Sequence, residues 1–161
     1  MGKITNALEK LTGSFFSKQE NTKAILREIK KYHLDISKDL FYGTSHPGYK
    51  EIDIIFDEVE KNISRTASGS YNKEYDQIVS LGEIISSKIV SAYLNESGVK
   101  NTWMDVREVI KTDDTYREGK VNWELTEKLV RSRLTPSLSK GEGVMVTQGF
   151  LGSTVDGFTT T

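Results

Sequence analysis

Glu83 is the ionisable residue of greatest chemical interest, because the helix predicted around it is apolar on two faces. Apolar residues recur at helical spacing between residues 73 and 95, so we expect one helix that is covered on both sides. A narrow polar strip of Asp76, Ser80, Glu83 and Ser87 runs between those faces, since each residue advances about 100° around the axis. A partly desolvated carboxylate in this strip is a candidate functional group. The alternative is a strip that faces water, which the pattern alone favours because most helix glutamates are solvated.

Several glycines lie where a backbone or a ligand can come close. Gly82 costs a helix about 1 kcal/mol relative to Ala, so its presence indicates the close approach of another backbone or a ligand. Residues 149–152 (Gly-Phe-Leu-Gly) and 157–161 (Gly-Phe-Thr-Thr-Thr) offer amides and hydroxyls that can hold a carboxylate or phosphate. Residues 2–6 offer helix-start amides to an anion. Ordinary loops and a frayed terminus are the alternatives, and the bare pattern favours them.

The remaining polar residues indicate structural roles. We expect Asp105 and Arg107 to form a local ion pair, and residues 112–114 (Thr-Asp-Asp) to form a solvated turn rather than a Mg²⁺ site. His33 lies on a helix stripe and His46 stands beside a proline, so both are expected to be structural. The sequence has no Walker loop, dinucleotide fingerprint or nucleophile elbow.

Composition excludes several classes of function. The 161 residues fit one domain, and 22 basic against 23 acidic side chains give a net charge of −1, so neither nucleic acid nor a membrane is an expected partner. There are no cysteines and two histidines, which excludes disulfides and argues against zinc, and no metal site is expected. No apolar run is long enough for a membrane span, and we expect a cytoplasmic protein.

Helices dominate the predicted first half of the chain. Residues 1–11 resemble a helix start, and residues 17–20 (Ser-Lys-Gln-Glu) can form a capping box before a second helix. Turn formers at 42–48 end that helix, and another follows, antiparallel to it, up to residues 66–70. The apolar stripes are Ile25, Ile29, His33, Ile36 and Leu40 in the first of this pair, and Ile52, Ile55, Phe56, Val59 and Ile63 in the second. Because the connection is short, the two stripes should be buried against each other.

The second half predicts strands that alternate with a helix. We expect a strand at 99–104, a helix from Asn122 to a stop at Thr135 and Pro136, and a strand at 143–149. This order is typical of an α/β unit with parallel strands, whose ligands lie beyond the carboxyl ends of the strands, where residues 149–152 are found. Two strands are too few for a viable parallel sheet, so we expect strands to be missing and both ends to be cut.

Separated motifs then combine into a resemblance. They are Met-Gly-Lys-Ile-Thr-Asn at 1–6, Val-Ser-Leu-Gly-Glu-Ile-Ile-Ser-Ser at 79–87, Trp-Met-Asp-Val-Arg at 103–107 with Ile-Lys-Thr-Asp-Asp at 110–114, and Val-Thr-Gln-Gly-Phe-Leu-Gly at 146–152 with Gly-Phe-Thr-Thr-Thr at 157–161. In this order and spacing they resemble the catalytic domain of aspartate kinase, in the amino acid kinase family. The resemblance implies an α/β class and an incomplete three-layer αβα amino acid kinase fold, helix-rich, with a mostly parallel sheet that lacks its first strand and its C-terminal half. It also implies one partial catalytic domain over 1–161, with a helical excursion at 17–69 and a substrate-side α/β core at 73–161.

The resemblance also implies a reaction. The family transfers the γ-phosphoryl group of ATP, with Mg²⁺, to the side-chain carboxylate of L-aspartate, the first step towards lysine, threonine and methionine. By their matching positions, Thr5, Glu83, Phe150, Gly152 and Thr161 are implied to contact the substrate, and Glu83 to organise the catalytic site. This reverses the water-facing interpretation of Glu83. No residue is assigned to the nucleotide or to a metal.

Two family motifs are absent from the sequence: an opening Lys-Phe-Gly-Gly-Thr-Ser, and a Leu-Gly-Arg-Gly-Gly-Ser-Asp after the threonines. Because phosphoryl transfer depends on positioned positive charge, we expect the chain alone to be a fragment without measurable aspartate kinase activity. We also expect an exposed sheet edge to allow self-association. The alternative function is a helical protein-interaction module without catalysis. Glutamate kinase and the uridylate kinase branch fit the motifs less well.

Overall fold

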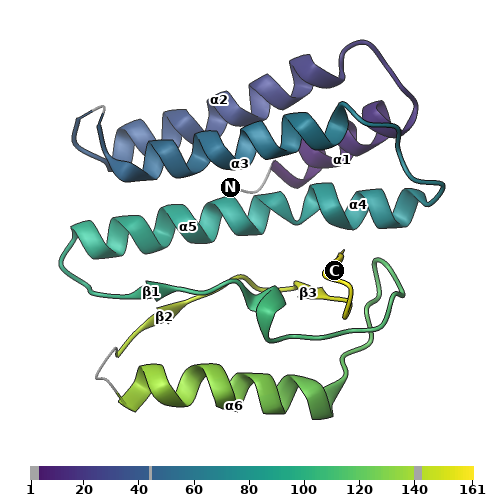
Figure 1. Ribbon diagram of the computed structural model, residues 1–161. Helices are drawn as coiled ribbons and strands as arrows, with labels where there is room; N and C mark the ends of the chain where they lie inside the picture. Colours follow the sequence, from purple (N-terminus) through teal and green to yellow (C-terminus); the bar gives the residue numbers. More distant parts are fainter. Residues whose placement is uncertain (1–3, 44, 140–142) are drawn as a thin grey trace. The chain divides into compact units, whose positions relative to one another are not determined.

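The chain divides into two compact units, residues 1–85 and 86–161, in a computed structural model that describes residues 4–43, 45–139 and 143–161. The first unit is helical, and the second contains the described strands (Figure 1). The first unit holds α1 (Ile4–Phe16), α2 (Thr22–Leu40), α3 (Pro47–Ile63), α4 (Tyr71–Val79) and the start of α5 (Leu81–Glu96). The second holds the rest of α5, β1 (Thr102–Trp103), the 3-10 turn η1 (Val106–Glu108), α6 (Trp123–Ser139), β2 (Met145–Val146), β3 (Gly152–Ser153) and β4 (Thr159–Thr160).

This mixture of elements confirms the helix-rich α/β class. Residues 1–3 of the predicted helix start lie outside the described residues, and α1 is helical from Ile4 onward. In the described part of the chain, no helix combines the length and apolarity that a membrane crossing requires.

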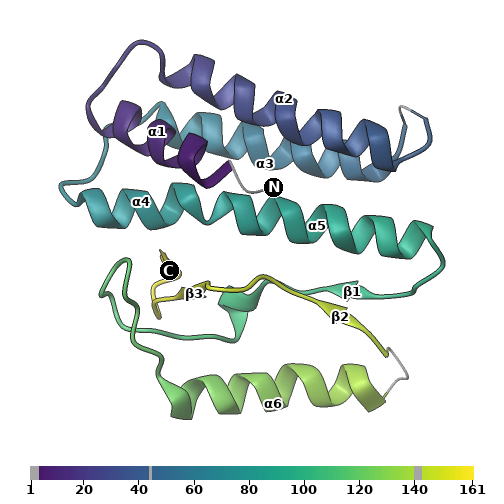
Figure 2. The same ribbon diagram turned by 180° about the vertical axis from the view of Figure 1, so that it is seen from behind.

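Helices α2 and α3 form the predicted antiparallel pair, side by side in both views (Figures 1 and 2). His46 caps α3, because its ring accepts a hydrogen bond from the backbone N–H of Gly48 at 3.0 Å, and Pro47 occupies the first turn. The buried residues of α3 are Ile52, Phe56, Val59 and Ile63, and those of α2 are Thr22, Leu26, Ile29, His33 and Ser37. The prediction that the two helices bury their stripes is confirmed, although the stripe of α2 is displaced around its axis because α1 packs on it as well as α3.

The predicted capping box at residues 17–20 is wrong. The backbone N–H of Ser17 donates to Gly13 at 3.0 Å, so this segment completes the end of α1. Lys18 then reverses the chain in the left-handed region, at φ 55°. The next helix begins at Thr22, and its N-cap Asn21 makes no capping bond with its side chain.

The single helix predicted over 73–95 is divided at Ser80 into α4 and α5. The hydroxyl of Ser80 donates to the carbonyl of Gln77 at 3.3 Å, and the backbone bond from Ser80 to Asp76 is long, at 3.4 Å. A serine hydroxyl that competes for a helix carbonyl weakens the backbone ladder at that point. The prediction of cover on both sides is also wrong in part, because Val90 is 47% exposed.

Strands β1 and β2 form the predicted parallel pair, in the register Thr102 with Met145 and Trp103 with Val146. Each strand lies within the predicted segment but is shorter. Between them in sequence, α6 runs alongside the pair in both views, as expected for a βαβ crossover (Figures 1 and 2). The predicted stop at Pro136 is wrong, since α6 continues to Ser139. A proline removes only one backbone bond, so a helix can continue through it with a bend.

The residues after β2 were expected to form loops, but they contain an antiparallel hairpin. Gly152 pairs with Thr160, and Ser153 pairs with Thr159. Gly157 turns the chain between the two strands at φ 84°. The threonine-rich segment is therefore a fixed strand rather than a free tail.

Candidate active site

The two predicted site residues of the first unit lie at helix starts that pack against each other. Thr5 stands in the first turn of α1, and Glu83 in the first turn of α5. A Cβ atom added to Gly82 would lie 3.1 Å from Leu8 and 3.5 Å from Ile4, so the glycine lets α1 approach α5 closely. The close approach predicted for Gly82 is therefore confirmed, but the approaching groups are side chains of α1 rather than a backbone or a ligand.

Both site residues are open to solvent at this helix contact. Thr5 and Glu83 follow directly on Ile4 and Gly82, and both are exposed. The polar strip is not uniform, because Asp76 and Ser80 are fully buried while Glu83 is not. The exposed Glu83 side chain and the exposed Thr5 side chain therefore come from the starts of two helices that meet at Gly82.

The three predicted site residues of the second unit lie on or beside the hairpin. Phe150 is 92% exposed and holds a left-handed backbone, at φ 60°, which is uncommon for an aromatic residue. Gly152 is required, because a Cβ atom there would lie 2.8 Å from Thr112 and 3.2 Å from the carbonyl of Ile110. Thr161 follows β4, and its carbonyl accepts from the N–H of Gly119 at 3.2 Å. Tight packing around Gly152 therefore fixes the backbone that presents the exposed Phe150 ring.

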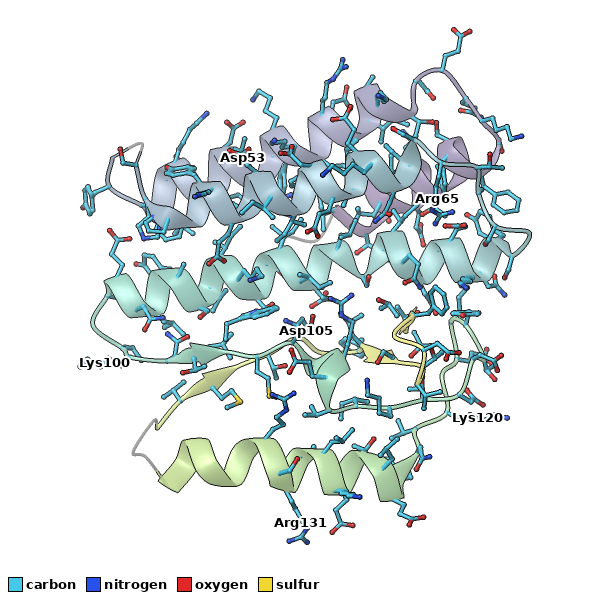
Figure 3. The ribbon with its side chains drawn as sticks, viewed as in Figure 1. Asp53, Arg65, Lys100, Asp105, Lys120 and Arg131 are labelled. Atoms are coloured by element: carbon cyan, nitrogen blue, oxygen red, sulfur yellow. The ribbon has the colours of Figure 1, made fainter. Side chains whose placement is uncertain are left out.

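The predicted ion pair of Asp105 and Arg107 is confirmed, and it reaches the hairpin. Arg107 donates from Nε and Nη2 to the carboxylate of Asp105, and from Nη1 to the hydroxyl of Thr159 at 2.9 Å. Figure 3 shows Asp105 beside the 3-10 turn. Burial alone would raise the pKa of Asp105, but the hydrogen bonds and charge of Arg107 outweigh it and hold that pKa below its usual value.

Sequence reasoning missed a second network, which connects α5 to the strands of the same unit. The Ser87 hydroxyl accepts from the Trp103 indole at 3.0 Å and from the Gln148 amide at 3.1 Å. The other end of the Gln148 amide accepts from the N–H of Val106 at 2.8 Å. Lys88 lies over the Trp103 ring, 3.9 Å from its centroid. The resemblance contains this glutamine in its Val-Thr-Gln-Gly motif, but only the fold shows what it binds.

The acidic turn forms as predicted, and both histidines make local structural contacts. The Asp113 carboxylate accepts from the backbone N–H groups of Lys120 and Thr115, which hold its pKa below the usual value. No group of three possible metal ligands occurs among the residues that the structure describes. His33 is buried and donates from Nδ1 to the Ile29 carbonyl, while His46 caps α3.

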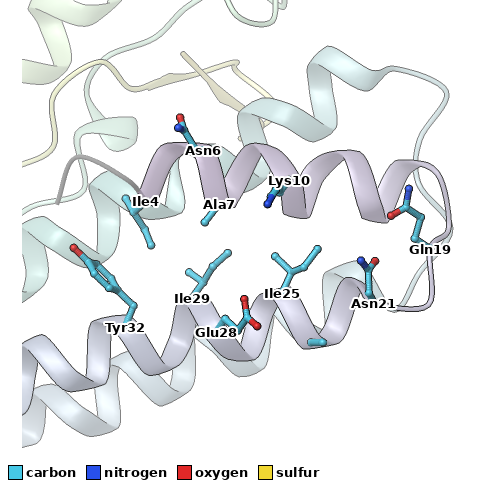
Figure 4. A pocket seen from close by; sticks show the side chains of 11 residues that line it. Ile4, Asn6, Ala7, Lys10, Gln19, Asn21, Ile25, Glu28, Ile29 and Tyr32 are labelled. Atoms are coloured by element: carbon cyan, nitrogen blue, oxygen red, sulfur yellow. The ribbon is translucent and has the colours of Figure 1, made fainter.

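A groove of about 910 Å³ lies between α1 and α2 (Figure 4). Its floor includes Ile4, Ile25 and Ile29, with Lys10 on α1 and Glu28 on α2. None of the five predicted site residues lines it. The groove is therefore separate from the candidate site.

Comparison with known proteins gives a consistent picture. Residues 7–161 match the model of the amino acid kinase family. A segment of 86 residues is 37% identical to lysine-sensitive aspartokinase 3 of Escherichia coli. This segment covers 53% of this chain and 19% of that protein.

Two solved structures of E. coli aspartokinase III extend the similarity to the fold. The structure in complex with lysine and aspartate has a TM-score of 0.82, and the one with aspartate and ADP has 0.81. Each is 28% identical, and the alignment covers 98% of this chain and 34% of that one. The chain thus spans about a third of the length of these structures and about a fifth of the curated relative. The family match over most of the chain shows that it belongs to the amino acid kinase family, as its motifs predict.

Proposed function

We propose that this chain forms the aspartate side of an aspartate kinase active site, in an enzyme that transfers the γ-phosphoryl group of ATP to the side-chain carboxylate of L-aspartate. The observation that carries the proposal is the similarity of 98% of the chain to aspartokinase III, a protein solved with aspartate and ADP bound. The exposed Glu83 carboxylate and the packed hairpin beside Phe150 support it independently.

The proposed contacts follow the chemistry of L-aspartate, which carries one ammonium group and two carboxylates. Glu83 is a candidate catalytic residue that binds the ammonium group and organises the site, because an exposed carboxylate can accept its N–H bonds. The hydroxyls of Thr5 and Thr161 are candidate donors to the substrate carboxylates. Phe150 and the Gly152 backbone are the further proposed substrate contacts.

ATP and Mg²⁺ belong to the proposed reaction, but we assign no residue of this chain to either. Among the described residues there is no group of three possible metal ligands, and the Asp113 carboxylate accepts backbone bonds within its own turn. We infer that the chain by itself has no measurable aspartate kinase activity. Phosphoryl transfer requires uncompensated positive charge around the transferring group, and the guanidinium of Arg107 is neutralised by Asp105.

The partial domain over 1–161, with a helical excursion at 17–69 and a substrate-side core at 73–161, is part of the same proposal. We also propose self-association, because β1 and β2 form a sheet of two strands, whose outer edges can pair with another copy. Light scattering tests this, and a monodisperse monomer would contradict it. A cytoplasmic location suits the proposed biosynthetic role.

The test of the function is a segment exchange. The equivalent third of E. coli aspartokinase III is replaced by this chain, and the exchange protein is assayed with aspartate, ATP and Mg²⁺ for ADP release and for aspartyl phosphate trapped as the hydroxamate. We expect turnover that depends on aspartate, and none from the chain assayed alone. A folded exchange protein without turnover would overturn the proposal.

One observation favours the alternative function, a helical interaction module without catalysis. The groove between α1 and α2 is mainly apolar and is separate from the proposed site. If the exchange protein were folded but inactive, the groove would become the next surface to study, by a pull-down with the wild-type chain and an Ile25→Asp variant.

A further inference from the structure

Arg107 contacts both strands of the hairpin from the 3-10 turn. Its backbone carbonyl accepts from the hydroxyl of Ser153 on β3 at 2.8 Å, and its Nη1 donates to the hydroxyl of Thr159 on β4 at 2.9 Å. Ser153 and Thr159 face each other in the strand register. One residue therefore holds both members of a cross-strand pair, although it lies 52 positions from Thr159 in sequence.

Asp105 fixes the orientation of this guanidinium. The carboxylate accepts from Arg107 Nε at 2.9 and 3.1 Å, from Nη2 at 2.5 Å, and from the Arg107 backbone N–H at 3.0 Å. A two-pronged pair of this kind orients the planar group as well as neutralising it. The side chain of Asp105 is only 16% exposed and that of Arg107 is 31% exposed. A compensated, oriented arginine is suited to holding protein groups rather than to gripping an anion.

The hairpin carries the proposed substrate residues on either side of this clamp. Because Gly152 pairs with Thr160, the segments that hold Phe150 and Thr161 leave the hairpin at the same end, opposite its turn. The spacing between these two segments depends on how firmly β3 and β4 are held together.

We propose that Arg107, oriented by Asp105, is a positioning residue that clamps β3 to β4 and thereby sets the placement of Phe150 and Thr161 for L-aspartate. The last clause rests on the proposed function. The clamp itself does not, since it is a property of the second unit alone.

The clamp can be opened without removing the turn. Lys111 donates from Nζ to the Arg107 carbonyl and to the Ser153 hydroxyl, at 2.8 Å each. Neither bond uses the Arg107 side chain, so both can survive a change of that side chain. The specific part is the bond to Thr159, which Thr159→Val removes with little change of shape. Thr160→Val is the matched control. It removes the neighbouring hydroxyl, which is hydrogen-bonded at 2.7 Å to the hydroxyl of Thr112 and not to Arg107.

The first measurement is amide hydrogen exchange of β4, by NMR on the chain itself. We expect Arg107→Met and Thr159→Val each to lower protection of the Thr160 amide, which belongs to the Gly152–Thr160 pair, by about tenfold, the scale of one hydrogen bond to a charged group. The double variant should be no worse than either single variant, while Thr160→Val combined with Arg107→Met should be additive. Independent, additive effects of Arg107→Met and Thr159→Val would overturn the clamp.

The second measurement is steady-state kinetics in the exchange protein. We expect Thr159→Val to raise KM for aspartate about tenfold with nearly unchanged kcat and unfolding midpoint, and Arg107→Lys to behave like Arg107→Met because lysine lacks the fork. A purely structural role would instead lower the folded fraction and the apparent kcat at constant KM. Unchanged KM in both variants of an active exchange protein would refute the positioning role while leaving the proposed function intact. If the wild-type exchange protein were inactive, the proposed function would fail and amide exchange alone would decide on the clamp.

Discussion

Replacing Glu83 by glutamine tests the proposed substrate carboxylate most directly. The change keeps the size and hydrogen-bonding shape of the side chain but removes its charge. Glu124 provides a matched control, because it is also an exposed glutamate in the first turn of a helix, α6. Loss of a first-turn carboxylate costs a helix at most about 1 kcal/mol, so both variants should remain folded.

The expected difference between the two variants lies in catalysis. A hydrogen bond between a carboxylate and the aspartate ammonium group contributes about 1.5–3 kcal/mol, so Glu83→Gln should lower kcat/KM for aspartate roughly 10- to 150-fold. Glu124→Gln should leave kcat/KM unchanged. Both are measured in the exchange protein by hydroxamate formation over a range of aspartate concentrations. If Glu83→Gln kept a kcat/KM within about twofold of the control, the assignment of Glu83 to the substrate would be refuted.

Three further predictions concern packing at Gly152 and two buried ionisable groups of the first unit, Glu74 and His33. Gly152→Ala should destabilise the chain by about 1–3 kcal/mol, because the added Cβ would overlap a neighbouring side chain. Gly149→Ala should be close to neutral, because a Cβ there has no neighbour within 4 Å. Urea denaturation of the two variants measures the difference. Arg65, which Figure 3 shows after α3, donates two hydrogen bonds to the carboxylate of the buried Glu74. Burial alone would raise the pKa of Glu74, but the bonds from Arg65 and from a backbone N–H outweigh burial and lower that pKa from 4.5. Arg65→Met should therefore lower the free energy of unfolding by about 1–2 kcal/mol at pH 7, a modest amount because Arg65 is 44% exposed and solvent screens the pair. The stabilisation should be complete above pH 4.5 and should be lost as the pH falls through the lowered pKa of Glu74. Denaturation curves at a series of pH values measure this. Burial lowers the pKa of His33 from 6.5 despite its bond to a helix carbonyl, so the unfolded chain binds a proton more readily than the folded chain. The unfolding midpoint of the wild type should therefore fall as the pH drops below 6.5. The midpoint of His33→Met should show no such step.

Local patterns in the sequence were sufficient for most of the helices. The 3.6-residue period predicts α2 and α3 because an amphipathic helix repeats its apolar face regardless of what covers it, and the turn formers at 42–48 predict the break between the two helices. The same logic failed at Ser17 and Ser80. The capping pattern at Ser17 does not show that the Ser17 amide completes the end of α1. The continuous apolar stripe does not show that the Ser80 hydroxyl competes for the Gln77 carbonyl.

The motifs also identified the family, and the family match confirms it. That resemblance, rather than spacing alone, implied Thr5, Glu83, Phe150, Gly152 and Thr161 as substrate contacts. Their roles remain proposals. What no pattern contained was the environment of each side chain. Gly82 and Glu83 are adjacent in sequence, yet one packs against α1 and the other faces solvent.

Which distant residues meet follows from the fold and not from local patterns. The sequence predicted the ion pair of Asp105 with Arg107, because the two are neighbours on one turn. It did not determine that the same arginine reaches Thr159, that Gln148 binds Val106, or that Gly152 lies against Thr112. Local conformation depends on short-range sterics and hydrogen bonds that a sequence window contains. The register between strands and the close packing of residues distant in sequence depend instead on how the whole chain buries its apolar surface. Both are fixed only when remote segments pack together.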